Sequence, residues 1–193
     1  MKTISILLLC SLLTNYSFSQ VDKGNWLIGG NGLAKFNKRK NINQGGQIVL
    51  ERQTDINANI LIGRFVADRF VIGAMPYFAF YRTKVLPDGN INSKVDQYGL
   101  GLFTRYYLLP SDKAINFLFE TSYQAGVYSF VPIKGKSSIL SASIGSVFFF
   151  NSSVGLEVLA GYQQRRVKIG TSPNFTDRGL DINIGFQFYL EKD

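Results

Sequence analysis

The chain has 193 residues, with 21 Lys and Arg against 13 Asp and Glu, and its net charge is +8. It contains no histidine and one cysteine. This composition excludes Ser–His–Asp and Cys–His nucleophilic sites and argues against a zinc or copper centre. We therefore expect a single domain that is not an enzyme and holds no metal or cofactor.

The first 19 residues have the features of a cleaved signal peptide. Lys2 is followed by an apolar run from Ile4 to Leu13 and by the small-x-small sequence Ser17-Phe18-Ser19. The run is too short for a spanning helix. It also contains Cys10, so residues 20–193 have no cysteine and form no disulfide. Export favours lipid phosphates or acidic glycans over nucleic acid as partners of this basic chain.

Eight later segments alternate apolar and polar residues with a period of two, which predicts β-strands. In the last one, Leu180, Ile182 and Ile184 share one face, and no segment after residue 20 shows a helical period. Pro76 interrupts the third segment and predicts a bulge or a late start of pairing, because proline has no N–H to donate. The segments cover about 25–37, 46–65, 70–82, 95–108, 115–130, 138–150, 154–166 and 179–190.

The links between these segments alternate in length. The second, fourth and sixth links are short, at 66–69, 109–114 and 151–153. The others tend to be longer and more polar, at 37–46, 83–94, 129–138 and 165–179. This alternation predicts an up-and-down meander with two unlike ends. It is typical of outer-membrane barrels and has no reason to occur in a Greek-key sandwich.

The two faces of the strands differ in a way that favours a membrane barrel. The polar face mixes long polar side chains with many glycines, which suits the filled interior of an eight-stranded barrel. The apolar face carries aromatic residues at strand ends, as lipid-facing girdles do. The alternative is a soluble lipocalin-like carrier or a sandwich, in which the apolar face would be the core.

The chain from residue 20 resembles the small bacterial outer-membrane β-barrel family, the OmpA/OmpX-like group. The sequence GRFVADRFVIG at 63–73 resembles a hairpin common in that family. Residues near the end resemble its barrel-assembly signal, although this chain continues to Asp193: Asn183, Gly185, Phe188 and Leu190. The resemblance implies an all-β, eight-stranded antiparallel up-and-down transmembrane β-barrel in the outer membrane of a Gram-negative-type cell. Its partners would be outer-membrane lipid and the barrel-assembly machinery, and both ends would be periplasmic.

Three charged residues fall on the predicted luminal face, and we expect them to form a buried ion network: Arg105, Glu120 and Glu157. Unpaired charges in such an interior cost several kcal/mol each, so a network is the favoured interpretation. The alternative is that the two glutamates act as general acid and base, as in glycosidases.

Basic residues cluster in the first and last long links: Lys38, Arg39 and Lys40, and Arg165, Arg166 and Lys168. Closing a barrel sets the first and last strands side by side, so we expect the two clusters to meet at the external end. They could bind lipopolysaccharide phosphates or anionic glycans, or simply keep a charged rim soluble. We expect a non-enzymatic structural or surface-interaction protein, with a narrow pore as the second candidate and a soluble carrier as the third.

Overall fold

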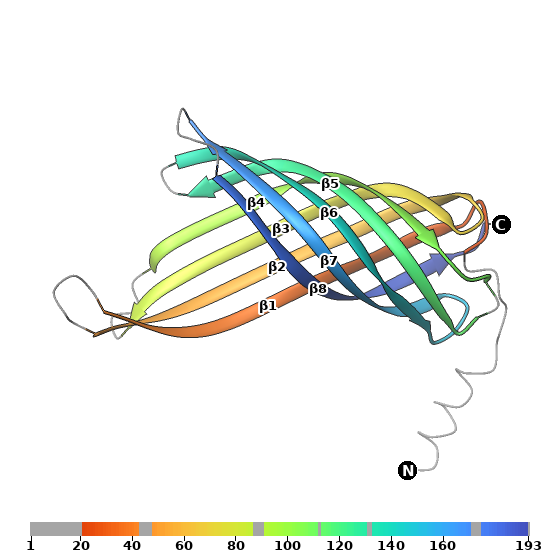
Figure 1. Ribbon diagram of the computed structural model, residues 1–193, viewed down its shortest axis with the longest axis horizontal. Coiled ribbons are helices and arrows are strands. Elements are labelled where there is room, and N and C mark those ends of the chain that lie inside the picture. Colours follow the sequence, from red (N-terminus) through yellow and green to blue (C-terminus); the bar gives the residue numbers. More distant parts are fainter. Residues whose placement is uncertain are drawn as a thin grey trace, which may run out of the picture.

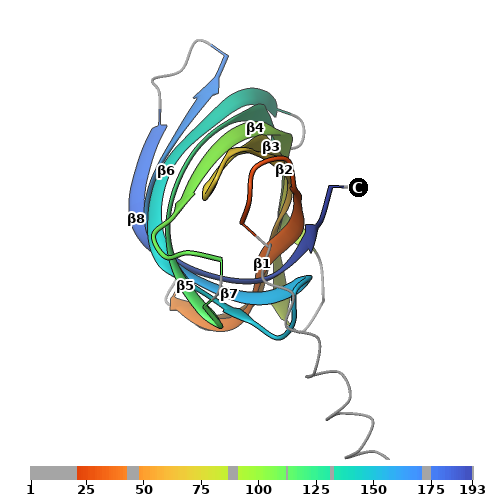
Figure 2. The ribbon, with the colours of Figure 1, turned by 90° about the vertical axis from the view of Figure 1, so that its right-hand side faces the viewer.

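The computed structural model describes residues 21–42, 48–86, 91–111, 113–130, 133–170 and 175–192. The predicted signal peptide at 1–19 lies outside these residues. Eight antiparallel strands close into one barrel in chain order, with β8 beside β1 (Figures 1 and 2). They are β1 (Trp26–Ile42), β2 (Ile48–Ala67), β3 (Phe70–Leu86), β4 (Ile91–Tyr107), β5 (Ile115–Phe130), β6 (Ile133–Phe149), β7 (Val154–Ile169) and β8 (Phe175–Leu190). The predicted all-β, eight-stranded up-and-down barrel is confirmed.

The alternation of faces is as predicted, with the apolar face outward. Ile182 is 64% exposed, whereas Glu157, on the other parity of the neighbouring strand, is 1% exposed. Large apolar side chains point outward from every strand. In the described part of the chain, no helix has the length and apolarity needed to cross a membrane.

The strands are longer than predicted at the end with the long links. β1 continues to Ile42, β4 begins at Ile91 and β8 begins at Phe175, each about four residues beyond the predicted limit. The apolar alternation stops where outward side chains become polar, but backbone pairing does not need that alternation. Much of the predicted loop sequence therefore forms the arms of paired hairpins.

Pro76 produces neither the predicted bulge nor a late start of pairing. It is paired with Leu100 of β4, and toward β2 the ladder lacks only the two pairs between Asn59–Tyr77 and Ile62–Ala74. The register is the same on both sides of that gap. The expectation was wrong because proline removes a single donor, and the flanking pairs hold the strand in place.

The half of the lumen near the short turns is filled by apolar side chains, which the sequence analysis did not predict. The cluster consists of Val21, Leu27, Leu61, Phe65, Val71, Met75, Phe103, Tyr107, Leu118, Val147, Leu159 and Tyr189. The segment before β1 lies against this end, where Arg69 N–H donates to the Val21 carbonyl (2.7 Å) and Gly24 N–H to that of Phe65 (2.8 Å). These contacts close the floor of the barrel.

Glycine pairs make room for aromatic rings that cross the lumen. Gly99 of β4 is paired with Gly126 of β5, and the ring of Tyr77 lies over both. A Cβ atom added at Gly99 would lie 2.6 Å from Cε1 of Tyr77 and 2.7 Å from the Gly126 Cα. The Tyr77 hydroxyl lies 3.1 Å from Ser137 Oγ on β6, so the ring spans from β3 to the opposite wall.

We predict that Gly99→Ala lowers the free energy of unfolding by about 1–3 kcal/mol, because the new methyl group overpacks the lumen. Gly179→Ala is the matched control, since nothing lies within 4 Å of a Cβ at that position. Urea unfolding of the refolded barrel measures the free energy of unfolding of both variants. Equal stability of the two would show that Tyr77 does not need the glycine pair.

Candidate lumen site

The three predicted luminal charges are in direct contact. Arg105 Nε donates to Glu120 Oε2 (3.0 Å) and Arg105 Nη1 donates to Glu157 Oε2 (2.6 Å). Arg105 Nη2 reaches both carboxylates, at 2.5 Å to Glu120 Oε2 and 3.2 Å to Glu157 Oε1. Arg105 is 0% exposed. The guanidinium thus bridges β5 and β7 across the lumen from β4.

Neighbouring polar groups complete the network. Arg105 Nη1 also donates to the Tyr107 hydroxyl (3.2 Å), which lies 3.0 Å from the Tyr189 hydroxyl. Gln187 Nε2 donates to Glu157 Oε1 (3.3 Å). A guanidinium that bonds both carboxylates occupies the space a substrate would need between them, so this geometry favours a structural network over an acid–base pair.

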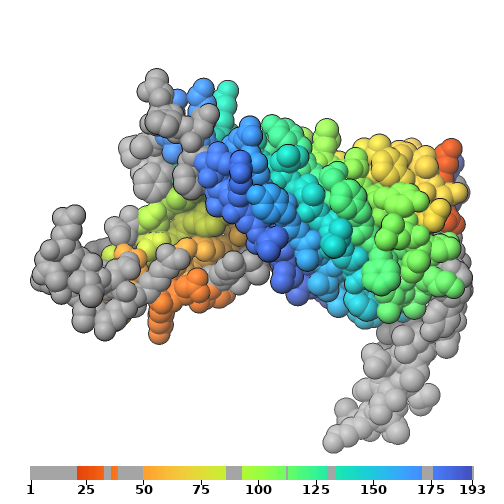
Figure 3. Space-filling model, in the orientation of Figure 1, coloured from red at the N-terminus to blue at the C-terminus, as the bar shows by residue number. Residues whose placement is uncertain are grey.

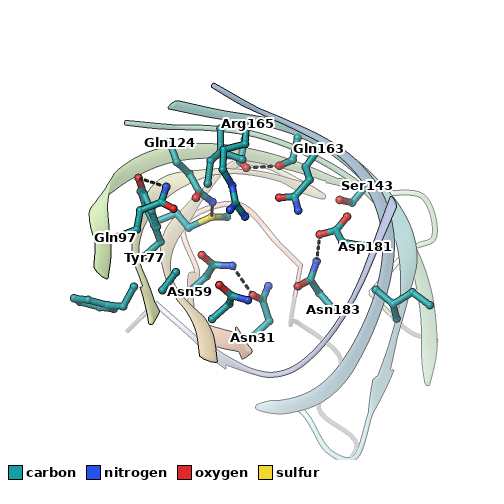
Figure 4. Close-up of a pocket in the computed structure, with 18 of the residues that line it drawn as sticks. Asn31, Asn59, Tyr77, Gln97, Gln124, Ser143, Gln163, Arg165, Asp181 and Asn183 are labelled. Carbon is teal, nitrogen blue, oxygen red and sulfur yellow. Dashed lines mark hydrogen bonds between the residues drawn. The ribbon is translucent and has the colours of Figure 1, made fainter. Parts of the chain in front are cut away.

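A cavity of about 630 Å³ lies above this network, in the half of the barrel with the long hairpins (Figure 4). The sequence analysis predicted a filled interior instead. Here the inward side chains are mostly short or amide-bearing, and several bond to each other rather than across the lumen. Asn59 Nδ2 donates to Asn31 Oδ1 (2.8 Å), and Asn183 Nδ2 donates to Asp181 Oδ2 (2.7 Å).

Three buried polar atoms at the cavity have no hydrogen-bond partner among the described residues: Gln97 Oε1, Arg165 Nε and Asp181 Oδ1. Arg165 lies over the ring of Tyr81, at 5.9 Å from its centroid. Buried polar groups are normally bonded. These atoms are available to a polar occupant of the lumen, whether water or a ligand.

The two predicted basic clusters do not meet on paired strands. β1 pairs with β8 only from Trp26–Leu190 to Gly32–Ile184. Above this point β1 stays with β2 and β8 stays with β7, so the clusters lie on two separate hairpins (Figure 1). Lys38, Arg166 and Lys168 are exposed, and the side chains of Arg39 and Lys40 lie outside the described set.

Arg165 and Arg166 face opposite sides of the wall. Arg165 lines the lumen cavity, while Arg166 is exposed on the outer face. Treating both as one rim cluster was wrong, because successive residues of a strand point to opposite faces.

Basic residues also form rows around the outside, directly above the apolar band. Lys38 is paired with Arg52, and Arg52 with Lys84, across β1, β2 and β3. Lys136 is paired with Lys168 across β6 and β7. Like charges in directly opposed positions destabilise a sheet unless anions compensate them. Sequence reasoning missed Arg52, Lys84 and Lys136, which lie in the halves of β2, β3 and β6 near the long hairpins.

The residues that resemble an assembly signal all lie in β8. Asn183 lines the lumen, Gly185 is paired with Asn31 and Glu157, and Phe188 and Leu190 are exposed on the outer face. Recognition by the assembly machinery remains a prediction.

Comparison with solved structures places the chain among outer-membrane barrels by fold. The outer membrane protein OprG from Pseudomonas aeruginosa is 13% identical, with a TM-score of 0.57 over 91% of this chain and 100% of that one. Neisserial surface protein A is 14% identical, with a TM-score of 0.54 over 86% of this chain and 97% of that one. No protein-family model and no curated protein sequence matches the chain. The resemblance inferred from the sequence is confirmed at the level of the fold.

We predict that Arg105→Met lowers the free energy of unfolding by about 3–5 kcal/mol, because it leaves two buried carboxylates without their cation. The triple variant Arg105→Met/Glu120→Gln/Glu157→Gln should recover much of that loss, since the network then contains no charged group. Thermal and urea unfolding in detergent micelles measure both. An Arg105→Met barrel as stable as the parent would contradict a structural role for the network.

Proposed function

We propose that the protein is an integral outer-membrane β-barrel with its short turns on the periplasmic side and its long hairpins at the cell surface. The observation that carries the proposal is the band of exposed apolar side chains around a barrel whose interior holds the charges. In β8 this band extends from Leu180 to Leu190, which matches the ~9–11 residues of a tilted membrane strand.

The two edges of the band support this placement. Near the short turns, the Arg64 guanidinium lies over Trp26 and that of Arg69 over Tyr106, each 5.7 Å from the ring centroid. Aromatic and basic residues of this kind are typical of a membrane interface. Both ends of the described chain lie at this edge, where Lys192 N–H donates to Asn25 Oδ1 (3.1 Å).

The role we assign is non-enzymatic interaction with anionic groups at the cell surface. The rows Lys38–Arg52–Lys84 and Lys136–Lys168 lie where the phosphates of outer-leaflet lipids would be. Phosphate oxygens would compensate the like charges that the paired strands bring together. Lipopolysaccharide phosphates are the ligands that fit this position.

A narrow pore is less well supported. The apolar cluster and the Arg105 network fill the lumen near the short turns, and the segment from Val21 lies across that end. An eight-stranded barrel has an interior that side chains can fill, and here they fill half of it. We therefore propose a barrel that does not conduct solutes.

Arg166→Gln combined with Lys168→Gln should weaken lipid A binding more than tenfold at low salt, because each cation near the headgroups contributes about 1 kcal/mol. Arg165→Gln is the matched control, since its side chain lines the lumen. Titration of lipid A into the barrel in neutral detergent measures both. Unchanged binding in the double variant would exclude the Lys136–Lys168 row as the binding site.

Incorporation of the barrel into planar bilayers should give no sustained conductance, because its floor is closed. The same preparation should migrate differently on gels before and after heating, which reports a folded, membrane-inserted barrel. Steady ion-conducting steps from folded protein would favour the pore instead.

A further inference from the structure

The barrel is incompletely closed between its first and last strands. β1 and β8 share seven residue pairs, ending at Gly32–Ile184, and residues 33–42 and 175–183 then part. Figure 3 shows the wall hollowed between the blue β8 and the orange β1, with yellow-green atoms of the opposite wall visible behind. We call this opening the seam.

The seam begins inside the apolar band. Leu180 and Phe36 lie beside it on the outer face, and they are 87% and 71% exposed, the highest values among the large apolar residues described. Below them, Ile182 continues the band on β8. Open strand edges facing lipid are not tolerated unless the backbone groups lie against a cavity or another polar partner. The edges at the seam therefore need polar groups on their lumen side, where the cavity lies.

The lumen cavity extends to this seam. Its lining includes Leu180 and Ile182 together with the inward Asp181, Asn183 and Asn31. Polar lumen and lipid-facing surface thus meet along one strand edge. An occupant that satisfies both sides must be amphipathic.

We propose that the upper lumen is a side-entry binding site for a single-chain amphiphile whose head group donates hydrogen bonds and carries no negative charge. The head group lies among the luminal amides, and the acyl chain leaves through the seam along Leu180 and Phe36. This rests on the membrane placement proposed above. A cavity of about 630 Å³ is large enough for such a head group.

The charges at the cavity select the head group. Among the side chains that the structure describes, those of Asp55, Asp177 and Asp181 and the guanidinium of Arg165 line it. The unpartnered Gln97 Oε1 and Asp181 Oδ1 are acceptors. A carboxylate or phosphate head group would face these three carboxylates, whereas hydroxyl donors would bond to them. The closed floor makes the lumen a binding site rather than a passage.

The two edges of the seam are also complementary in the register that the lower pairs set. Continued upward, that register would place Phe36 opposite Leu180. These two exposed apolar side chains would face each other on the outer face. The edges of the empty seam can therefore meet, and a covalent bond between them should block entry of the amphiphile.

A reversible cross-link tests the proposal. The variant Phe36→Cys/Leu180→Cys closes the seam by a disulfide, and Ile28→Cys/Phe188→Cys is the matched control at a pair that is already closed. The probe is a monoacylglycerol with a photoreactive acyl chain, added to the mature barrel in phosphatidylcholine nanodiscs. Peptide mapping locates the label, and gel migration of the same samples confirms insertion separately.

We expect the parent and the control to be labelled on β8 between 175 and 190, and the oxidised seam variant to lose labelling at least tenfold until it is reduced. Asn31→Leu with Asn59→Leu leaves the seam unlocked and should lower labelling in the same assay. Unchanged labelling in either variant overturns the proposal, as does equal labelling by a photoreactive fatty acid. Disulfide-linked dimers would identify the seam as a contact between copies instead.

Discussion

Closure of the sheet in a lipid environment is the constraint on which the rest of this structure depends. A strand that faces hydrocarbon must bond its backbone groups to neighbours on both sides, so the first and last strands have to meet. In this barrel seven pairs, from Trp26–Leu190 to Gly32–Ile184, provide that contact. These pairs lie at the short-turn end, where apolar side chains also fill the lumen. The closed wall and the packed lumen stabilise each other there.

The interior follows from this arrangement. Where the wall is complete, Arg105 bridges two carboxylates and apolar side chains pack beneath them. A buried guanidinium between two buried glutamates is tolerable because every charge has a bonded partner. Where the wall parts, the described inward residues are mostly polar, and the lumen holds a cavity. One barrel therefore combines a packed floor with an open, polar upper chamber.

The arrangement of the outer surface follows from the alternation of strand side chains between the two faces of the wall. Arg165 and Arg166 are adjacent in the chain, yet one lines the chamber and the other lies on the outer face. Cross-strand pairing then assembles basic rows from residues far apart in the sequence, such as Lys38, Arg52 and Lys84. The concentration of positive charge above the apolar band is a property of the sheet rather than of any one segment.

The sequence by itself determined the strand count, the up-and-down order of the strands, the outward apolar face and the inward placement of Arg105, Glu120 and Glu157, because alternation and turn length are local properties. It did not determine the apolar floor, the cavity, the pairing at Pro76 or the parting of β1 from β8. Those depend on which side chains meet across the lumen and on how far two distant strands remain paired. Such contacts join residues from 24 positions apart, as in the Pro76–Leu100 pair, to more than a hundred apart, as in the pairs of β1 with β8, and no local pattern along the chain records them.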